Sequence, residues 1–243
     1  MPLAPSVGAI ADRWADVRRR IEAAAQRAGK AGSEVQVVVV TKGHSPSVVR
    51  EAYAAGARQF GENRVEELSA KAASLPEPKD AVWHMVGHIQ SRKVRDLWPG
   101  VAMVHSVDRL KIAQRLNDWA GEAGRRLEVL LECNVSGEST KAGWRLGDRR
   151  NWEGALPEIE AVARLPHLTT LGLMTMAPEG AEPAAVRAVF RRLAELRAYL
   201  RNRLGLAWPH LSMGMTDDFE IAVEEGATLV RVGRAILGER PLG

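Results

Sequence analysis

The stretch Val35-Gln-Val-Val-Val-Val-Thr-Lys42 is a short apolar run that ends in a lysine. Valine is β-branched and suits strands, and a continuous apolar run of this length is typical of a parallel strand buried on both faces. The stretch therefore predicts a buried parallel strand with an amine at its C-terminal end. Sheets of such strands occur in α/β proteins, so the run also indicates the fold class.

Lys42 is the best clue to function in this chain. Lysine is strongly hydrated and seldom buried, so a lysine at a strand end either extends to water or is held there for chemistry. Removal from water favours the neutral amine, which attacks aldehydes to form a Schiff base. For an isolated lysine, a solvated position at the rim would be the better interpretation.

Segments that are typical of strands and helices alternate along the chain. Further strands are predicted at 58–61, 82–87, 103–107, 128–135, 169–176, 210–214 and 229–233. Helices are predicted at 7–29, 46–55, 62–74, 108–123, 183–204 and 217–225. About eight strands in alternation with helices predict an α/β protein with a single (β/α)8 TIM-type barrel domain over residues 1–243, preceded by the helix at 7–29. An open doubly wound sheet is the alternative.

The composition is that of a globular protein in a reducing compartment. Hydrophobic residues make up 46% of the chain, and the net charge of +4 is too small to indicate a nucleic-acid partner. Cys133 is the only cysteine, which excludes an internal disulfide framework. The first residues do not form a signal peptide, and no apolar run approaches the ~20 residues that span a bilayer. We therefore expect a cytoplasmic protein without a membrane partner.

Two other predicted strand ends carry features that suit an anion. After the seventh strand, Ser212 offers a hydroxyl and Gly214 lets backbone amides approach a ligand closely. On the eighth strand Arg231 and Gly233 share one side, and Arg234 then opens a short predicted helix. Loops after strands seven and eight are the usual phosphate position in such barrels. Either motif alone would be explained by glycines that permit tight turns.

These features combine if the barrel closes, because the first strand then lies beside the eighth. A lysine that forms Schiff bases next to a phosphate site describes a site for pyridoxal phosphate. A class I aldolase-like barrel that acts on a phosphorylated sugar is a second hypothesis for the same features. A scaffold without a ligand is a third, and it leaves both phosphate motifs unexplained.

Motifs along nearly the whole chain support the first hypothesis. They are Val40-Thr-Lys42, Phe60-Gly-Glu-Asn63, Trp83 to Lys93, His105 to Asp108, Asn134 to Glu138 with Lys141 and Gly143, Leu173 to Thr175, Leu211 to Glu220, and Val230 to Gly233. In content and order they resemble the motifs of the pyridoxal-phosphate homeostasis protein family, whose fold is similar to the barrel domain of alanine racemases. The resemblance implies a protein that binds pyridoxal 5'-phosphate and serves intracellular vitamin B6 homeostasis.

The resemblance also implies a role for individual residues. Lys42 would form the covalent Schiff base, Arg231 would face the pyridine nitrogen, and Asn63 would lie beside the ring. The other implied cofactor contacts are His84, Met174, Ser212, Met213, Gly214, Gly233 and Arg234. The sequence departs from the family pattern in the loop Gly43 to Pro46, at Thr140 and Thr216, where serine is common, and at Arg234, where relatives often carry a small hydroxyl residue.

The resemblance favours a carrier over an enzyme. An arginine donates hydrogen bonds and accepts none, so it would keep the ring nitrogen unprotonated and weaken the ring as an electron sink. Alanine racemases tolerate this arrangement but add a tyrosine from a further domain of a partner subunit. We expect no such domain here, because the chain ends directly after the eighth unit, and Tyr53 and Tyr199 fall in predicted outer helices.

We therefore expect a monomer without catalytic residues that buffers pyridoxal phosphate and passes it to apo-enzymes. A pyridoxal-phosphate-dependent racemase of low activity is the alternative.

Other candidate chemistry is weaker. His84 and His88 are four residues apart but flank Gly87 at a strand end, so no helix aligns them as metal ligands. Cys133 in an apolar strand is expected in the core rather than as a nucleophile. Lys141, after the fifth strand, is either a solvated lysine or a second transient site for the aldehyde.

Overall fold

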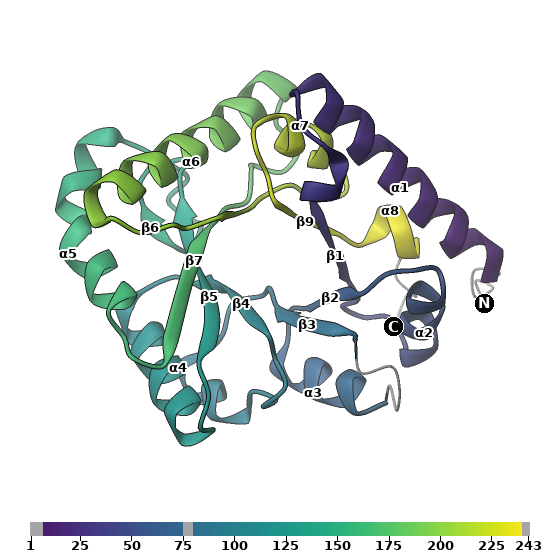
Figure 1. Cartoon of the computed structure of the whole chain (residues 1–243), viewed down its shortest axis with the longest axis horizontal. Helices are drawn as coiled ribbons and strands as arrows, with labels where there is room; N and C mark the ends of the chain where they lie inside the picture. The colour runs from purple at the N-terminus through teal and green to yellow at the C-terminus, as the bar shows by residue number, and fades with distance from the viewer. Residues whose placement is uncertain (1–6, 75–79, 240–243) are drawn as a thin grey trace.

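The computed structural model describes residues 7–74 and 80–239 and contains a closed ring of parallel strands (Figure 1). Within these ranges eight strands form the ring in the order β4-β3-β2-β1-β9-β8-β7-β5, which the pairing of β4 with β5 closes. The strands are β1 (Gln36–Val40), β2 (Gln59–Glu62), β3 (Val82–Met85), β4 (Met103–Val107), β5 (Leu127–Asn134), β7 (Leu168–Met174), β8 (His210–Ser212) and β9 (Leu229–Val232). The predicted (β/α)8 barrel is confirmed, and the open sheet is wrong.

Helices surround the ring (Figure 1). They are α1 (Val7–Arg27), α2 (Pro46–Ala54), α3 (Val65–Ser74), α4 (Leu110–Glu122), α5 (Trp152–Ala163), α6 (Pro183–Leu204), α7 (Phe219–Glu224) and α8 (Arg234–Leu237), with the 3-10 turns η1 (Gly32–Glu34), η2 (Ser91–Asp96) and η3 (Arg149–Asn151). No helix in the described part of the chain has both the length and the hydrophobicity needed to cross a membrane.

The observed elements include some that the sequence patterns do not predict. The short strand β6 (Trp144–Arg145) pairs with β5, and helix α5 contains Pro157, which interrupts the usual helical signal. Turn η2 stands where a helix after β3 is expected. The predicted strands at 35–42 and 210–214 are too long, because the chain turns into loops at their C-terminal ends.

Helix α1 is the added N-terminal helix, and it lies against α7, α8 and α2 on the outside of the ring (Figure 1). Its residues Ile10, Val17 and Ile21 are buried on one face. Helices α7 and α8 have only six and four residues. The long helix α1 therefore adds apolar cover where the two short helices lie.

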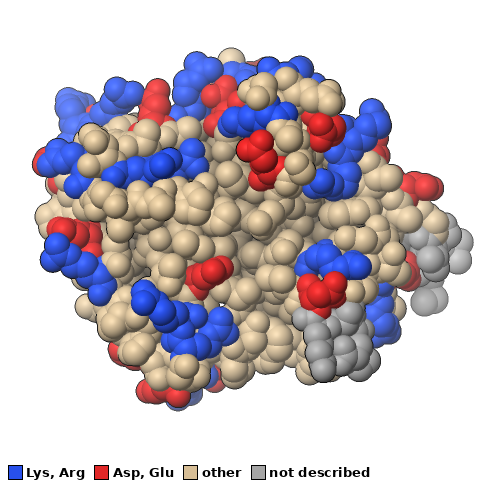
Figure 2. Space-filling view, in the orientation of Figure 1, with Lys and Arg blue, Asp and Glu red and all other residues tan. Residues whose placement is uncertain are grey.

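Side chains alternate along the strands and separate two parts of the core. On β1, Val37 and Val39 pack toward the helices. The cluster inside the ring consists of Val38, Met103, Leu130, Met174 and Leu229. Val40 lies two residues after Val38 on the same side of β1, and Lys42 follows two residues later, in the turn at the C-terminal mouth of the ring. On the face seen in Figure 2, charged side chains gather around the periphery, and the centre is mostly uncharged.

Candidate functional site

The C-terminal ends of the strands bring several predicted site residues to one mouth of the ring. Strand β1 pairs with β2 on one side and with β9 on the other, and β9 also pairs with β8. Lys42, two residues after β1, is therefore flanked by Asn63, which follows β2, and by Gly233, which follows β9. The prediction that ring closure brings the first strand beside the last is confirmed.

At Gly233 and Gly214 packing disfavours a larger side chain, independently of any ligand. A Cβ atom on Gly233 would lie 3.0 Å from the carbonyl oxygen of Val40. Gly214 has a φ of +94°, and a Cβ there would lie 2.5 Å from the Cβ of Ala222 and 2.9 Å from the Cα of Phe219. The close approach of α7 to the loop after β8 therefore requires glycine at Gly214, and the approach of β9 to β1 favours glycine at Gly233. A phosphate contact would be additional to this packing role.

Arg231 and Ser212 are joined inside the ring. Arg231 is 5% exposed, and it donates from Nη1 to Ser212 Oγ at 2.7 Å and from Nη2 to the carbonyl oxygen of Thr175 at 2.9 Å. Ser212 is fully buried, and its Oγ also lies 2.9 Å from His105 Nδ1. Burial lowers the pKa of Arg231 to about 10, which still leaves it charged at neutral pH. The hydroxyl that the sequence suggests for phosphate is thus engaged in holding the arginine.

This contact is one end of a chain of polar side chains that crosses the ring. His105 Nε2 lies 2.9 Å from His84 Nδ1, and His84 Nε2 lies 2.7 Å from Gln59 Oε1. We call Gln59, His84, His105, Ser212 and Arg231 the interior polar chain. Burial lowers the pKa of His84 to about 4 and that of His105 well below its usual value, so both rings are neutral at pH 7. Both ring nitrogens of His84, a predicted cofactor contact, have partners within the protein.

Glu132 is a buried acid that the sequence patterns do not single out. It is 5% exposed on β5. Burial and the charge of Asp108 raise the pKa of Glu132 to about 7, although Arg231 acts in the opposite direction. Glu132 lies two residues after Leu130, which is inside the ring, so strand alternation places Glu132 on the same inner face. Alternation along the predicted strand 128–135 is therefore the signal that could have identified it.

The remaining predicted neutral contacts lie at different depths. Asn63 is partly buried after β2. Met174 belongs to the cluster inside the ring, whereas Met213 is fully buried in the core that faces the helices. The exposed methionines that follow these strand ends are Met176 and Met215. Neither predicted methionine side chain therefore reaches the open surface of the mouth.

Two cationic residues that follow strand ends form ion pairs. Arg234 Nη2 contacts both carboxylate oxygens of Asp217, at 2.8 and 2.6 Å. Lys141 forms an ion pair with Glu138, and its Nζ donates to the carbonyl oxygen of Met176 at 3.1 Å. Arg234 is thus tied to the loop after β8, and Lys141 to the segment after β7.

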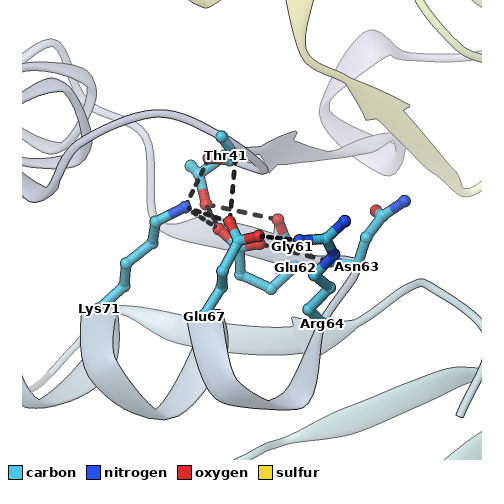
Figure 3. A network of polar contacts seen from close by, with 8 residues as sticks. Thr41, Gly61, Glu62, Asn63, Arg64, Glu67 and Lys71 are labelled. Carbon is cyan, nitrogen blue, oxygen red and sulfur yellow. Dashed lines mark hydrogen bonds and ion pairs between the residues drawn. The ribbon is translucent and has the colours of Figure 1, made fainter. Parts of the chain in front are cut away.

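A second polar assembly lies outside the ring, between β2 and α3 (Figure 3). We call Thr41, Glu62, Glu67 and Lys71 the Lys71 cluster. Lys71 Nζ donates to the carbonyl oxygen of Thr41 at 2.7 Å and forms ion pairs with Glu62 and, at 3.3 Å, with Glu67. Thr41 Oγ1 donates to Glu62 Oε1 at 2.5 Å. None of the sequence motifs predicts this cluster, although Glu67 and Lys71 have the four-residue spacing of helical ion pairs.

Other candidate residues have structural roles. Among residues 7–74 and 80–239, no group of three or more His, Cys, Asp and Glu side chains could hold a metal ion. His88 lies 3.2 Å from Asp108, and Cys133 is buried in the core that faces the helices. Tyr53 and Tyr199 lie on the outer helices α2 and α6, where their hydroxyls donate to carboxylates at 2.6 Å. The predictions for Cys133 and for the two tyrosines are confirmed.

Comparison with known proteins agrees with this geometry. The family model described as "Alanine racemase, N-terminal domain" matches residues 14–241. The pyridoxal phosphate homeostasis protein of Pseudomonas aeruginosa is 46% identical over 236 residues, which cover 96% of this chain and 97% of that protein. Its counterpart in Aquifex aeolicus is 40% identical over 229 residues, which cover 94% and 97%.

Solved structures give the same result. PipY of Synechococcus elongatus, solved with PLP bound, is 37% identical and superposes with a TM-score of 0.81, over 94% of this chain and all of PipY. Alanine racemase of Corynebacterium glutamicum, at 18% identity, shares the fold with a TM-score of 0.68 over 98% of this chain and 63% of the racemase. The chain, with its alanine-racemase-like barrel, thus belongs to the family of pyridoxal phosphate homeostasis proteins.

Proposed function

We propose that this protein binds pyridoxal 5'-phosphate, holds it as a Schiff base on Lys42, and buffers it in the cytoplasm for delivery to apo-enzymes. The observation that carries the proposal is the position of Lys42 at the C-terminal end of β1, the strand that pairs with the Arg231 strand β9. The relative PipY, solved with PLP bound, supports the identity of the ligand.

The side chains near the mouth fit an aromatic aldehyde that carries a phosphate. Lys42 supplies a primary amine, and Arg231 supplies a guanidinium whose orientation is set by two hydrogen bonds. Gly214 and Gly233 lie in the loops after β8 and β9, and neither residue has a side chain that would block a ligand. Phosphate is bound at these loops in many barrels. Asn63 and Arg234 are two further predicted contacts that belong to the site in this proposal.

Arg231 favours storage of the cofactor over turnover. Bound pyridoxal phosphate supplies an electron sink for reactions of amino acids, and the sink is strongest when its ring nitrogen is protonated. Arg231 donates hydrogen bonds and stays charged at neutral pH, so it would hold that nitrogen unprotonated. Ser212 contributes by fixing the guanidinium rather than by touching the phosphate.

Racemase activity is the alternative function, and the alanine racemase family model favours it. Both tyrosines of the chain lie on outer helices, so neither is available as the second proton donor opposite Lys42. We therefore expect exchange of the Cα proton of alanine in deuterated water to be no faster with this protein than with free pyridoxal phosphate. Fast exchange would favour the racemase.

Replacement of Lys42 tests the proposal directly. Lys42→Ala should abolish the adduct that borohydride reduces, because the amine that forms the Schiff base is gone. The matched control is Lys141→Ala, which removes a lysine after another strand end and should leave the adduct intact. The measurement is the visible absorbance before and after borohydride, followed by mass mapping of the reduced peptide. A full yield of adduct in Lys42→Ala, mapped to another residue, would overturn the assignment.

The phosphate assignment has a separate test at Arg234. Arg234→Ala should weaken binding of pyridoxal phosphate roughly tenfold, because a hydrogen bond to a charged group is lost. Binding of unphosphorylated pyridoxal should not change. The control Asp217→Asn releases Arg234 from its ion pair and should not weaken either ligand. Equal losses for both ligands in Arg234→Ala would contradict a phosphate contact.

A further inference from the structure

Lys42 occupies a tight turn that is closed by its neighbours. The carbonyl oxygen of Thr41 accepts the N–H of His44 at 3.0 Å, so residues 41–44 form a four-residue turn with Lys42 in the second position. Gly43, in the third position, has a φ of +74°, which favours glycine. The side chain of Lys42 therefore leaves the chain at a point whose geometry depends on the residues before and after it.

The Lys71 cluster contacts this turn on both sides of Lys42. Before it, the carbonyl oxygen of Thr41 accepts Lys71 Nζ at 2.7 Å. After it, the N–H of Gly43 donates to Glu67 Oε2 at 3.0 Å. Because Glu67 and Lys71 both belong to α3, the two contacts tie the turn after β1 to the helix after β2.

Burial and ion pairing favour a single geometry for these contacts. The Lys71 side chain is 7% exposed and that of Glu62 is fully buried. Partial burial alone would favour the neutral acid of Glu67, yet hydrogen bonds from Gly43 and Lys71 hold its pKa below the usual value. Buried ion pairs contribute little net stability, and one well-attested use is to specify a single geometry. The geometry specified here is that of the turn that carries Lys42.

We propose that Glu67 and Lys71 are positioning residues, which hold the amine of Lys42 where it can react with an aldehyde bound at the mouth. The proposal rests on the proposed function, since it assumes that Lys42 forms the Schiff base. Glu67 and Lys71 lie on the outer side of β2, and they contact the turn through the backbone oxygen of Thr41 and the backbone N–H of Gly43. Small displacements of a reacting group lower its effective concentration strongly.

The test separates covalent attachment from simple occupancy of the site. Pyridoxal phosphate reports both, whereas pyridoxine 5'-phosphate has the same ring and phosphate but an alcohol in place of the aldehyde. Glu67→Ala should weaken formation of the borohydride-reducible adduct roughly ten- to hundredfold, because the turn loses its contact at Gly43. The affinity for pyridoxine 5'-phosphate, measured by calorimetry, should stay within about twofold of wild type, because the cluster does not touch the bound ring.

Conservative and control variants sharpen the result. Glu67→Gln keeps a carbonyl oxygen for the N–H of Gly43 and should restore most of the adduct. Glu66→Gln changes the neighbouring acid on α3, which is exposed and paired with Lys93, and should match wild type with both ligands. If Glu67→Ala proves unstable, the double variant Glu62→Gln with Lys71→Met removes both buried charges together and should show the same selective loss.

Three outcomes would overturn the positioning role. The first is an unchanged adduct in Glu67→Ala and in the double variant, and the second is an equal loss of both ligands, which indicates general damage. In both cases the wild-type protein still forms its adduct at Lys42, so the proposed function survives. The third is a wild-type protein without a reducible adduct at Lys42, which overturns the proposed function as well.

Discussion

The interior polar chain crosses the inside of the ring, whereas the Lys71 cluster lies outside it, between β2 and α3. Both are buried, but they satisfy their polar groups in different ways. The cluster pairs a cation with two carboxylates. The interior polar chain contains one cation, Arg231, and otherwise neutral side chains. A helix surface can bring opposite charges to a strand, whereas side chains inside a narrow ring must fit into layers set by the strands.

The interior chain has a direction. Arg231 can only donate, so Ser212 accepts from it and can pass its own hydrogen to His105 Nδ1. The His105 Nε2 hydrogen then points to His84 Nδ1, and the His84 Nε2 hydrogen points to the Gln59 oxygen. Each neutral histidine donates once and accepts once. A proton added to His84 Nδ1 would face the hydrogen of His105 Nε2, so this arrangement depends on a neutral His84, whereas the cluster depends on charge.

The largest effect is expected from breaking the cluster on one side. Lys71→Met leaves the fully buried carboxylate of Glu62 without its cation, and loss of one partner of a buried ion pair costs about 3–5 kcal/mol. The double variant with Glu62→Gln removes both charges and should recover most of this loss. Urea unfolding at pH 7 measures the free energies. A single variant as stable as wild type would show that the cluster does not depend on its charge pair.

The next effect is a pH dependence that comes from the interior chain. The folded protein keeps His84 neutral down to its pKa of about 4, whereas the unfolded chain takes up a proton below its usual pKa of 6.5. Stability should therefore fall as the pH drops through this window, by up to about 3 kcal/mol from His84 alone.

Glu132 acts in the opposite direction. Its pKa of about 7 in the fold lies above the usual 4.5, so the fold favours the protonated acid and loses stability as the pH rises between these values.

The contribution of His84 is isolated by comparing wild type with His84→Gln between pH 7 and pH 4. Wild type should lose more stability than the variant on acidification, and parallel curves would contradict the neutral histidine.

A smaller effect is expected at the centre of the interior chain. Ser212→Ala removes the hydroxyl that joins His105 to Arg231 and leaves a buried donor and a buried acceptor without that partner. Such a loss costs about 1–3 kcal/mol. Ser212→Thr keeps the hydroxyl and serves as the control for the polar contact. Thermal and urea unfolding should rank wild type above Ser212→Ala, and an unchanged midpoint would mean that the two partners find other contacts.

Part of the candidate site could be predicted from the sequence because it depends on local pattern. The apolar run that ends at Lys42 predicts the first strand, although the strand itself ends at Val40, and side-chain alternation places Arg231 and Gly233 on one side. The eight-strand ring follows from the repeated alternation of strands with helices. Helix α5 was missed because Pro157 obscures its pattern, and β6 because two residues are too short to give one.

The partners of these residues were decided only by the tertiary structure. The sequence by itself determined that strands alternate with helices and that an amine follows the first strand. Ser212 meets His105, 107 residues away, and Lys71 meets Thr41, 30 residues away, only because ring closure brings their strands and helices together. Burial then sets the pKa of His84 and Glu132, since the loss of water around a side chain depends on the whole fold and not on its neighbours in sequence.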